Sequence, residues 1–259
     1  MPQELDPLPG GSKWEAGSLR ATTFILPGAE VAGTESWWGK VVGEGPEETT
    51  SRPRAGQLQQ VGVFEGKRLA LVIQPGRVDW NFLVALGSPD EVPERLLTMG
   101  PFPHALDPFL KVALKWLDIC PAATRLAFGA VLLRPVADRQ TGHTELSRLL
   151  PSIPIDPSNS SDFLYQINRP RMSASGVGGL KINRLTKWSV MQAGFVQLAV
   201  GAELGATLSS GPLQFGCRLE LDINTAAELS GEIPKDKIRS VFEELVSLGR
   251  EIANRGDIP

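Results

Sequence analysis

The side chains that most often carry proton transfer near neutral pH are scarce in this chain. It contains two histidines, His104 and His143. Neither is followed by a second His or a Cys at the spacing of zinc ligands, and the chain has no G-x-S-x-G nucleophile motif. The sequence therefore predicts that both histidines are surface or helix-start residues, and it assigns no catalytic residue, no metal and no cofactor.

Two pairs of polar residues lie on otherwise apolar, strand-like stretches. Glu220 and Asp222 are two positions apart, so they share one strand face and could hold a divalent cation if further carboxylates converge on them. The competing interpretation is a solvated strand face on which Arg218 neutralises part of the charge. Asp79 and Asn81 have the same spacing, and either pair could line an enzyme site in a cleft between two halves of the chain.

One glycine-rich loop, residues 173–179, is flanked by basic residues on both sides. Its glycines match neither the phosphate-binding P-loop nor the dinucleotide loop, so the pattern predicts a flexible connection between two strands. Five cations with no intervening acid surround the loop, and a tryptophan follows: Arg169, Arg171, Lys181, Arg184, Lys187 and Trp188. Such a strip could bind phosphates or an acidic protein surface. On a continuous strand Lys181 and Lys187 would share a face, whereas Arg184 would point the other way.

Composition excludes several classes of protein. The 259 residues include 42% apolar side chains and carry a formal net charge of −3, which is typical of a globular protein and lacks the positive field of a dedicated nucleic-acid binder. The two cysteines, Cys120 and Cys217, cannot build a disulfide framework and predict reduced, buried thiols.

The sequence predicts neither a signal peptide nor a membrane-spanning segment. The first residues have neither the basic nor the apolar region of a signal peptide, and the most apolar run, 126–133, is too short to span a bilayer. The sequence therefore predicts a cytoplasmic protein with no membrane contact.

Hydrophobic periodicity predicts an α+β fold made of antiparallel meanders, each followed by a helix. Residues 57–64, 67–74 and 78–86 predict a three-stranded meander. One face of the third strand carries Val78, Trp80, Phe82, Val84 and Leu86. A helix over 105–117 should cover that face, with an ion pair between Asp107 and Lys111.

Further elements follow the same patterns. Strands are predicted over residues 19–26, 124–134, 163–167 and 214–223, and residues 180–185 and 186–200 predict one or two more. Helices are predicted over 145–150 and 235–254. Gly256 is predicted to cap the last helix. Residues 43–56 predict a charged, mobile surface loop, and at least one residue of the Trp37–Trp38 pair is expected in the core.

Breaker-rich stretches suggest how the chain is divided. Residues 1–17 predict a flexible tail, residues 18–150 a first α+β half and residues 151–259 a second. The two halves should be similar in plan and could form one compact unit.

Two segments carry a resemblance. The stretch LALVIQPGRVDWNF, Leu69 to Phe82, and the stretch LELDIN, Leu219 to Asn224, before a long C-terminal helix resemble a sporadically distributed bacterial family of uncharacterised α+β proteins of similar length. The first 55 residues and residues 135–160 have no counterpart in that pattern. The resemblance implies a fold and an accessory gene, and it implies no activity.

Three functions stay open at this point. The absence of a catalytic constellation favours a non-catalytic binding or accessory protein that recognises another protein. The basic 169–188 strip, with Trp188 as a stacking platform, would suit nucleic acid. An enzyme with an unrecognised site, built on one of the polar pairs, is the third. The pattern does not indicate an oligomeric state.

Overall fold

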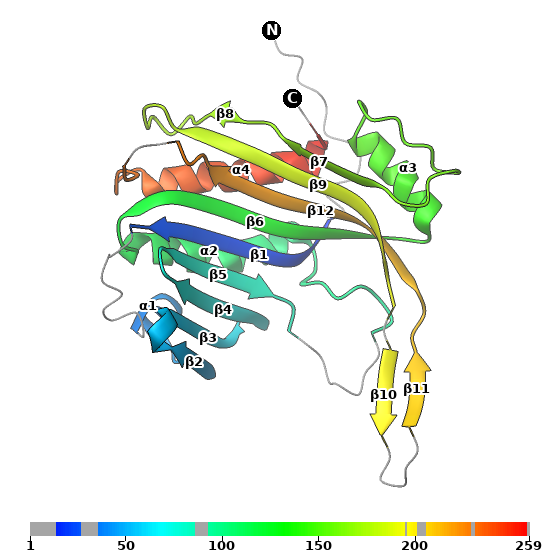
Figure 1. The fold of residues 1–259 in the computed structure, drawn as a ribbon, viewed down its shortest axis with the longest axis horizontal. Helices are drawn as coiled ribbons and strands as arrows, with labels where there is room; N and C mark the ends of the chain where they lie inside the picture. The colour runs from blue at the N-terminus through cyan, green and yellow to red at the C-terminus, as the bar shows by residue number, and fades with distance from the viewer. Residues whose placement is uncertain are drawn as a thin grey trace.

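The computed structural model describes residues 14–26, 36–85, 93–194, 196–200, 206–228 and 231–257. Ten strands form one antiparallel sheet and four helices accompany it, which confirms the α+β class (Figure 1). The strands of this sheet are β1 (Glu15–Ile25), β2 (Glu48–Arg52), β3 (Gln57–Phe64), β4 (Lys67–Gln74), β5 (Arg77–Leu83), β6 (Ala123–Val136), β7 (Leu164–Asn168), β8 (Arg171–Met172), β9 (Lys181–Ala193) and β12 (Gln214–Thr225). The helices are α1 (Trp37–Val42), α2 (Phe102–Ile119), α3 (Arg139–Leu149) and α4 (Ile238–Arg255).

The strand order across the sheet is β2-β3-β4-β5-β1-β6-β12-β9-β7, and β8 pairs with one end of β9. β1 pairs with β5, the last strand before α2, and β6 pairs with β12, the last strand before α4. One hydrophobic core lies against the sheet, and edge strand β2 contributes no residue to it. The similarity of the two predicted halves stays a prediction.

A separate hairpin projects from the ends of β9 and β12 (Figure 1). It consists of β10 (Val196–Val200) and β11 (Ala206–Ser210), which pair only with each other. Among the described residues, no helix combines the length and the apolarity that crossing a bilayer requires.

Strands β3, β4 and β5 form the predicted meander. The residues of its two turns explain how the strands are joined. Glu65 and Gly66 join β3 to β4 with φ of 47° and 72°, the paired left-handed conformation of a type I′ hairpin turn. Pro75 and Gly76 join β4 to β5, and Gly76 has a φ of 74°, as a proline–glycine type II turn requires.

The aromatic core lies between β5 and α2, as predicted. Trp80 of β5 is fully buried, and its ring centroid lies 6.3 Å from that of Trp116 on α2 and 5.8 Å from that of Trp38. Trp37 and Trp38 start helix α1, and both are buried because neighbouring helical positions can face the same core. Trp37 packs on Trp116 at 4.8 Å.

Several local predictions were wrong. The stretch 43–56, predicted as a loop, contains β2 and a short 3₁₀ turn, although its side chains are largely exposed. β1 begins at Glu15, inside the predicted tail, and Trp14 is 2% exposed, whereas residues 1–13 lie outside the described part. β5 ends at Leu83, short of the predicted end, and the predicted core position Leu86 lies outside the described residues.

The ion pair predicted within α2 does not form. Lys111 pairs with Glu65 of the β3–β4 turn at 2.8 Å, and Asp107 faces Arg250 of α4 at 3.8 Å. Both partners are distant in sequence, so spacing within the helix could not reveal them.

Helix α3 starts at Arg139, earlier than the helix predicted over 145–150, whereas α4 ends at the predicted cap. Asp138 caps α3 because its carboxylate accepts a hydrogen bond from the Thr141 amide at 2.7 Å. Gly256 ends α4 with a φ of 82°, as predicted. Cys120 and Cys217 are free and buried, also as predicted, and burial raises the pKa of the Cys217 thiol to about 12.

Candidate binding site on the open sheet face

The four helices lie on the same face of the sheet. Helix α2 packs on β1 and β5, α3 and α4 pack on β6, β9 and β12, and α1 packs on α2. In Figure 1, α2 and α4 lie behind the strands. Along β1, Leu19 and Ala21 point into this core, whereas Ser18 and Arg20 point to the other side. We call that other side the open face, because no described helix covers it.

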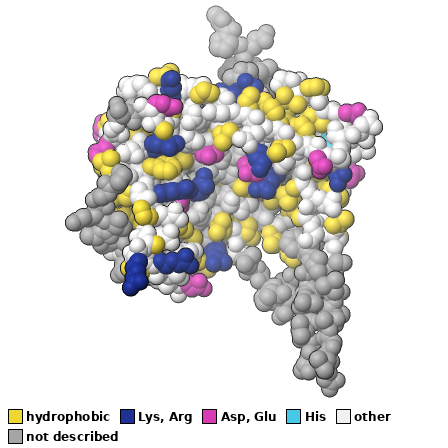
Figure 2. Space-filling model, in the orientation of Figure 1, with side chains coloured by type: hydrophobic (Ala, Val, Ile, Leu, Met, Phe, Trp, Pro, Cys, Tyr) yellow, Lys and Arg dark blue, Asp and Glu magenta, His cyan; other side chains and the backbone are white. Residues whose placement is uncertain are grey.

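A hollow of about 430 Å³ lies near the middle of the open face. Strands β5, β1, β6, β12, β9 and β7 all contribute to it. Its polar lining consists of Ser18, Arg20, Asn81, Gln166, Lys187, Glu220 and Asp222. Leu83, Val131 and Leu185 add apolar surface between these groups. Figure 2 shows this side of the molecule, with basic and acidic side chains distributed over the strands.

One row of the sheet crosses the centre of the hollow. The register aligns Asn81 on β5, Arg20 on β1, Gly129 on β6 and Asp222 on β12. A Cβ on Gly129 would lie 3.2 Å from Nε and 3.3 Å from Nη2 of Arg20, so the guanidinium extends across the glycine. The Arg20 side chain therefore lies directly over Gly129, which leaves room for it because glycine has no side chain.

Arg20 has no hydrogen bond and no ion pair with any described residue, and its Nε is buried. Guanidinium groups in protein interiors are normally paired, because leaving a buried donor unsatisfied costs free energy. An arginine in this state, at the centre of a hollow, is available to an anionic group from outside the chain.

The acidic pair Glu220 and Asp222 shares the open face, as predicted, but the two carboxylates differ in their partners. Glu220 is 3.2 Å from Nζ of Lys187 and 3.3 Å from Nη2 of Arg218. Asp222 accepts a hydrogen bond from the Asn224 side-chain amide at 3.1 Å and has no ion pair. Among the charged residues that line the hollow, Arg20 and Asp222 are therefore the two that form no ion pair with another described residue.

A second cluster stabilises one end of the open face. Arg77 and Arg125 lie over the ring of Phe24, at 5.7 and 4.8 Å from its centroid. Asp79 pairs with Arg77 at 2.7 Å and accepts a hydrogen bond from Thr22 at 2.5 Å. Asp79 is thus paired with Arg77 and Thr22 and does not line the hollow, whereas Asn81 does.

The open face is more basic than the chain as a whole. Strand register and alternation place eight basic and five acidic described residues on it: Arg20, Arg52, Arg68, Arg77, Arg125, Lys181, Lys187 and Arg218, and Glu15, Glu48, Asp79, Glu220 and Asp222. The whole chain carries a net charge of −3. The positive excess is therefore concentrated on one side of the sheet.

The basic strip predicted over 169–188 is divided between the two faces. Lys187 lies at the hollow, and Arg171 and Lys181 are exposed near one end of β9. Arg184 is 7% exposed and donates a hydrogen bond to the Arg169 carbonyl at 2.8 Å. The burial alternation along β9 confirms that Lys181 and Lys187 share a face opposite to Arg184.

Trp188 is not accessible for base stacking. It is fully buried on the helix side, and its ring centroid lies 6.2 Å from that of Trp14 in an edge-to-face contact. The sequence could not reveal this, because a tryptophan next to lysines is equally compatible with a core position on an alternating strand.

The glycine-rich loop 173–179 connects β8 to β9, which confirms that it is a strand connection. Ser173 donates a hydrogen bond to Glu244 of α4 at 2.6 Å, and the Ala174 amide donates to the same carboxylate at 2.8 Å. The loop is thereby attached to α4 through its first residues.

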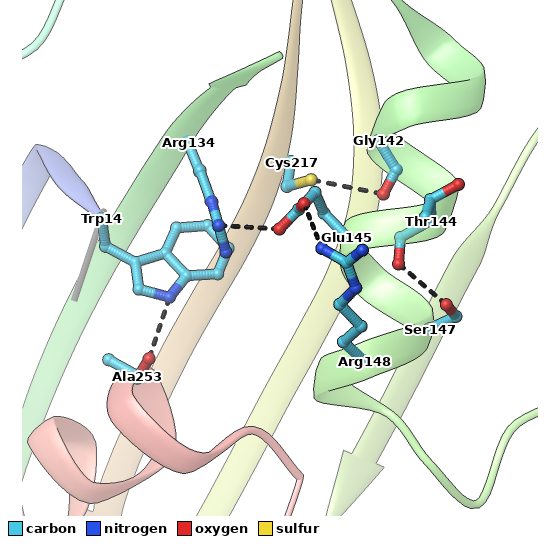
Figure 3. A network of polar contacts seen from close by, with 9 residues as sticks. All are labelled: Trp14, Arg134, Gly142, Thr144, Glu145, Ser147, Arg148, Cys217 and Ala253. Carbon is cyan, nitrogen blue, oxygen red and sulfur yellow. Dashed lines mark hydrogen bonds and ion pairs between the residues drawn. The ribbon is translucent and has the colours of Figure 1, made fainter. Parts of the chain in front are cut away.

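Polar contacts join α3 to the strands on which it packs (Figure 3). Glu145 pairs with Arg134 and with Arg148, each at 2.7 Å, and Cys217 donates to the Gly142 carbonyl at 3.4 Å. His143 is fully buried in α3 against Phe163, which corrects its predicted surface position. This cluster attaches α3 to β6 and β12, and its exposed member, Arg148, is held by Glu145.

The described residues contain no cluster of three or more His, Cys, Asp or Glu side chains that could hold a metal ion. The acidic pair on β12 therefore has no additional carboxylate for a divalent cation in the described part of the chain. No protein-family model and no curated protein matches this chain. Function is accordingly inferred from the open face alone.

Asp257 closes the C-terminal end of the fold on the helix side. Arg169 donates two hydrogen bonds to its carboxylate, both at 2.8 Å, and Tyr165 donates a third at 3.2 Å. The hydrogen bond from Arg169 is the main cause that lowers the pKa of Asp257. Arg169 and Arg184 thus have structural partners, in contrast to Arg20.

Replacing Asp257 with asparagine is expected to destabilise the protein by about 1–2 kcal/mol at pH 7, because the charge-assisted contact is lost. A lowered folded-state pKa stabilises the fold above the usual aspartate pKa of about 3.9 and ceases to do so as pH falls through the lowered value. The difference between the urea midpoints of the two proteins should therefore hold from pH 7 to about pH 5 and shrink only as pH falls further, past the usual aspartate pKa and through the lowered pKa of Asp257. Asp162→Asn, at an exposed position, is the control; a difference that stays constant with pH would contradict the role given to Asp257.

Proposed function

We propose that this protein is a non-catalytic binding protein that recognises an acidic segment of another protein on its open sheet face. The observation that supports this most directly is the positive excess on that face in a chain that is net acidic. Charge of one sign on one surface attracts a partner of opposite charge and raises the rate of encounter. The hollow is a concave region into which side chains of the partner can insert.

The lining of the hollow favours binding over catalysis. It contains no histidine and no cysteine, and its one ion-paired carboxylate, Glu220, is already neutralised by two cations. Apolar surface from Leu83, Val131 and Leu185 alternates with the charged groups. A mixture of apolar contact area and charges that select the partner is typical of transient protein interfaces.

Charge reversal at the rim of the open face tests the proposal. The probe is a fluorescein-labelled peptide rich in Glu and Asp, and its binding is followed by fluorescence anisotropy at low and at moderate salt. Arg52→Glu combined with Arg68→Glu is expected to weaken binding about tenfold at low salt, because two favourable charges become repulsive. Neither arginine has an ion pair in the structure, so the fold should tolerate both changes.

The matched control carries the same change in net charge on the helix side. Lys40→Glu combined with Lys237→Glu, on α1 and at the start of α4, should leave peptide binding unchanged. Equal weakening by both pairs would show that only net charge matters and would overturn the proposal. Tighter binding to a single-stranded oligonucleotide of equal charge would also overturn it, in favour of a nucleic-acid ligand.

A further inference from the structure

We infer that the hollow selects an extended segment that carries a carboxylate and, two residues away, a cationic side chain, with the carboxylate on Arg20 and the cation beside Asp222. This inference rests on the proposed function, since it specifies which part of the partner enters the hollow. It goes beyond general attraction to acidic surfaces, because it requires one positive charge in the partner at a defined place.

Arg20 provides the anion end. Its guanidinium extends over Gly129, where a Cβ would come within 3.2 Å of Nε, and no residue in the described part of the chain pairs with it. The planar guanidinium presents several N–H donors in a fixed arrangement that matches a carboxylate. Asn81 lies beside it in the same row of the sheet and adds an amide donor.

Asp222 provides the cation end. Its neighbour Glu220 already has Lys187 and Arg218 within 3.3 Å, whereas Asp222 has only the amide of Asn224. The unpaired negative charge of Asp222 would repel a second carboxylate from the partner and attract an ammonium or guanidinium group. The hollow therefore favours a negative group of the partner at Arg20 and a positive group beside Asp222.

The spacing of these two ends fits an extended peptide. Arg20 and Asp222 lie on strands that flank β6, so their backbones are about 10 Å apart at a strand spacing of about 4.8 Å. The guanidinium reaches over Gly129 and shortens this gap, yet no ion pair joins Arg20 to Asp222. In an extended segment, side chains two residues apart share a face and are about 6.6 Å apart. A Glu-x-Lys sequence can thus place one charge at each end.

The experiment compares two labelled peptides of equal length, one with a Glu-x-Lys repeat and one with a Glu-x-Glu repeat, against the wild-type protein and three variants. Arg20→Gln is expected to weaken both peptides about tenfold, because the carboxylate loses its partner. Asp222→Asn is expected to weaken the Glu-x-Lys peptide about fivefold and to strengthen the Glu-x-Glu peptide by a similar factor. Changes of opposite sign cannot arise from a loss of folding.

Gly129→Ala tests the geometry without altering any charge. The added Cβ would shift the Arg20 guanidinium by a few tenths of an ångström, so both peptides should bind slightly more weakly, whereas Gly178→Ala, in open space, should have no effect. If Arg20 paired directly with Asp222 in solution, Asp222→Asn would change the affinities of the two peptides in the same direction. That result would overturn the inference. Failure of the proposed function is distinct: neither peptide would bind the wild-type protein at low salt.

Discussion

Replacing Trp80 with alanine is expected to remove most of the soluble protein. The indole is fully buried on β5 between Trp38 and Trp116, and these three rings join the sheet to α1 and α2. Truncating a buried aromatic residue costs about 3–5 kcal/mol, and the net stability of a domain is only about 5–15 kcal/mol. Soluble yield and the urea midpoint are the measurements.

A graded pair of controls separates packing from general sensitivity. The Trp80 indole nitrogen has no hydrogen-bond partner, so Trp80→Phe keeps most of the buried area, loses no hydrogen bond and should be far milder than alanine. Leu164→Ala, on edge strand β7 with the residue 65% exposed, should leave the midpoint nearly unchanged. A Trp80→Ala protein that unfolds at the parental midpoint would place Trp80 outside the core.

The second large effect is expected at Gly256, where α4 ends. Any Cβ at this position would overlap the backbone carbonyl of Leu149 at the end of α3, and the φ of 82° is itself unfavourable for other residues. The obstruction is backbone rather than a movable side chain, so Gly256→Ala should cost at least about 2 kcal/mol. The next residue, Asp257, would also be displaced from Arg169.

Thermal unfolding monitored by circular dichroism measures this effect. Gly45→Ala and Gly178→Ala are matched controls, because both glycines lie in open space and neither has a positive φ. If Gly256→Ala melted at the temperature of these controls, the close approach of α4 to Leu149 would not exist in solution. A drop of several degrees relative to the controls is the expected result.

The open face distinguishes this protein from a sheet that is covered on both sides. Leaving one face of an antiparallel sheet to solvent is common, and that face then usually carries small, polar and charged residues without further consequence. Two observations set this one apart. Within the described residues, Arg20 has no partner although its Nε is buried. Asp222 likewise forms no ion pair there, although Lys187 and Arg218 both contact its neighbour Glu220.

Sequence reasoning identified individual members of the site but not the site itself. It selected Glu220, Asp222, Asn81 and Lys187, because polar residues on alternating strands stand out. It did not select Arg20 or Gly129, since an arginine and a glycine in strand-like stretches carry no local signal. Their importance depends on β1, β6 and β12 lying side by side, a pairing between segments about one hundred residues apart along the chain.

The sequence by itself determined the α+β class, the β3-β4-β5 meander, the buried thiols, the cap at Gly256 and the central position of Trp80. These features depend on short-range physics: turn residues with left-handed conformations, period-two burial and the length of apolar stripes. Only the tertiary structure decided which charges are paired and which face is open. Lys111 pairs with Glu65, Trp188 is buried against Trp14, and Arg20 stays unpaired, because long-range packing, rather than neighbouring sequence, selects the partner of each side chain.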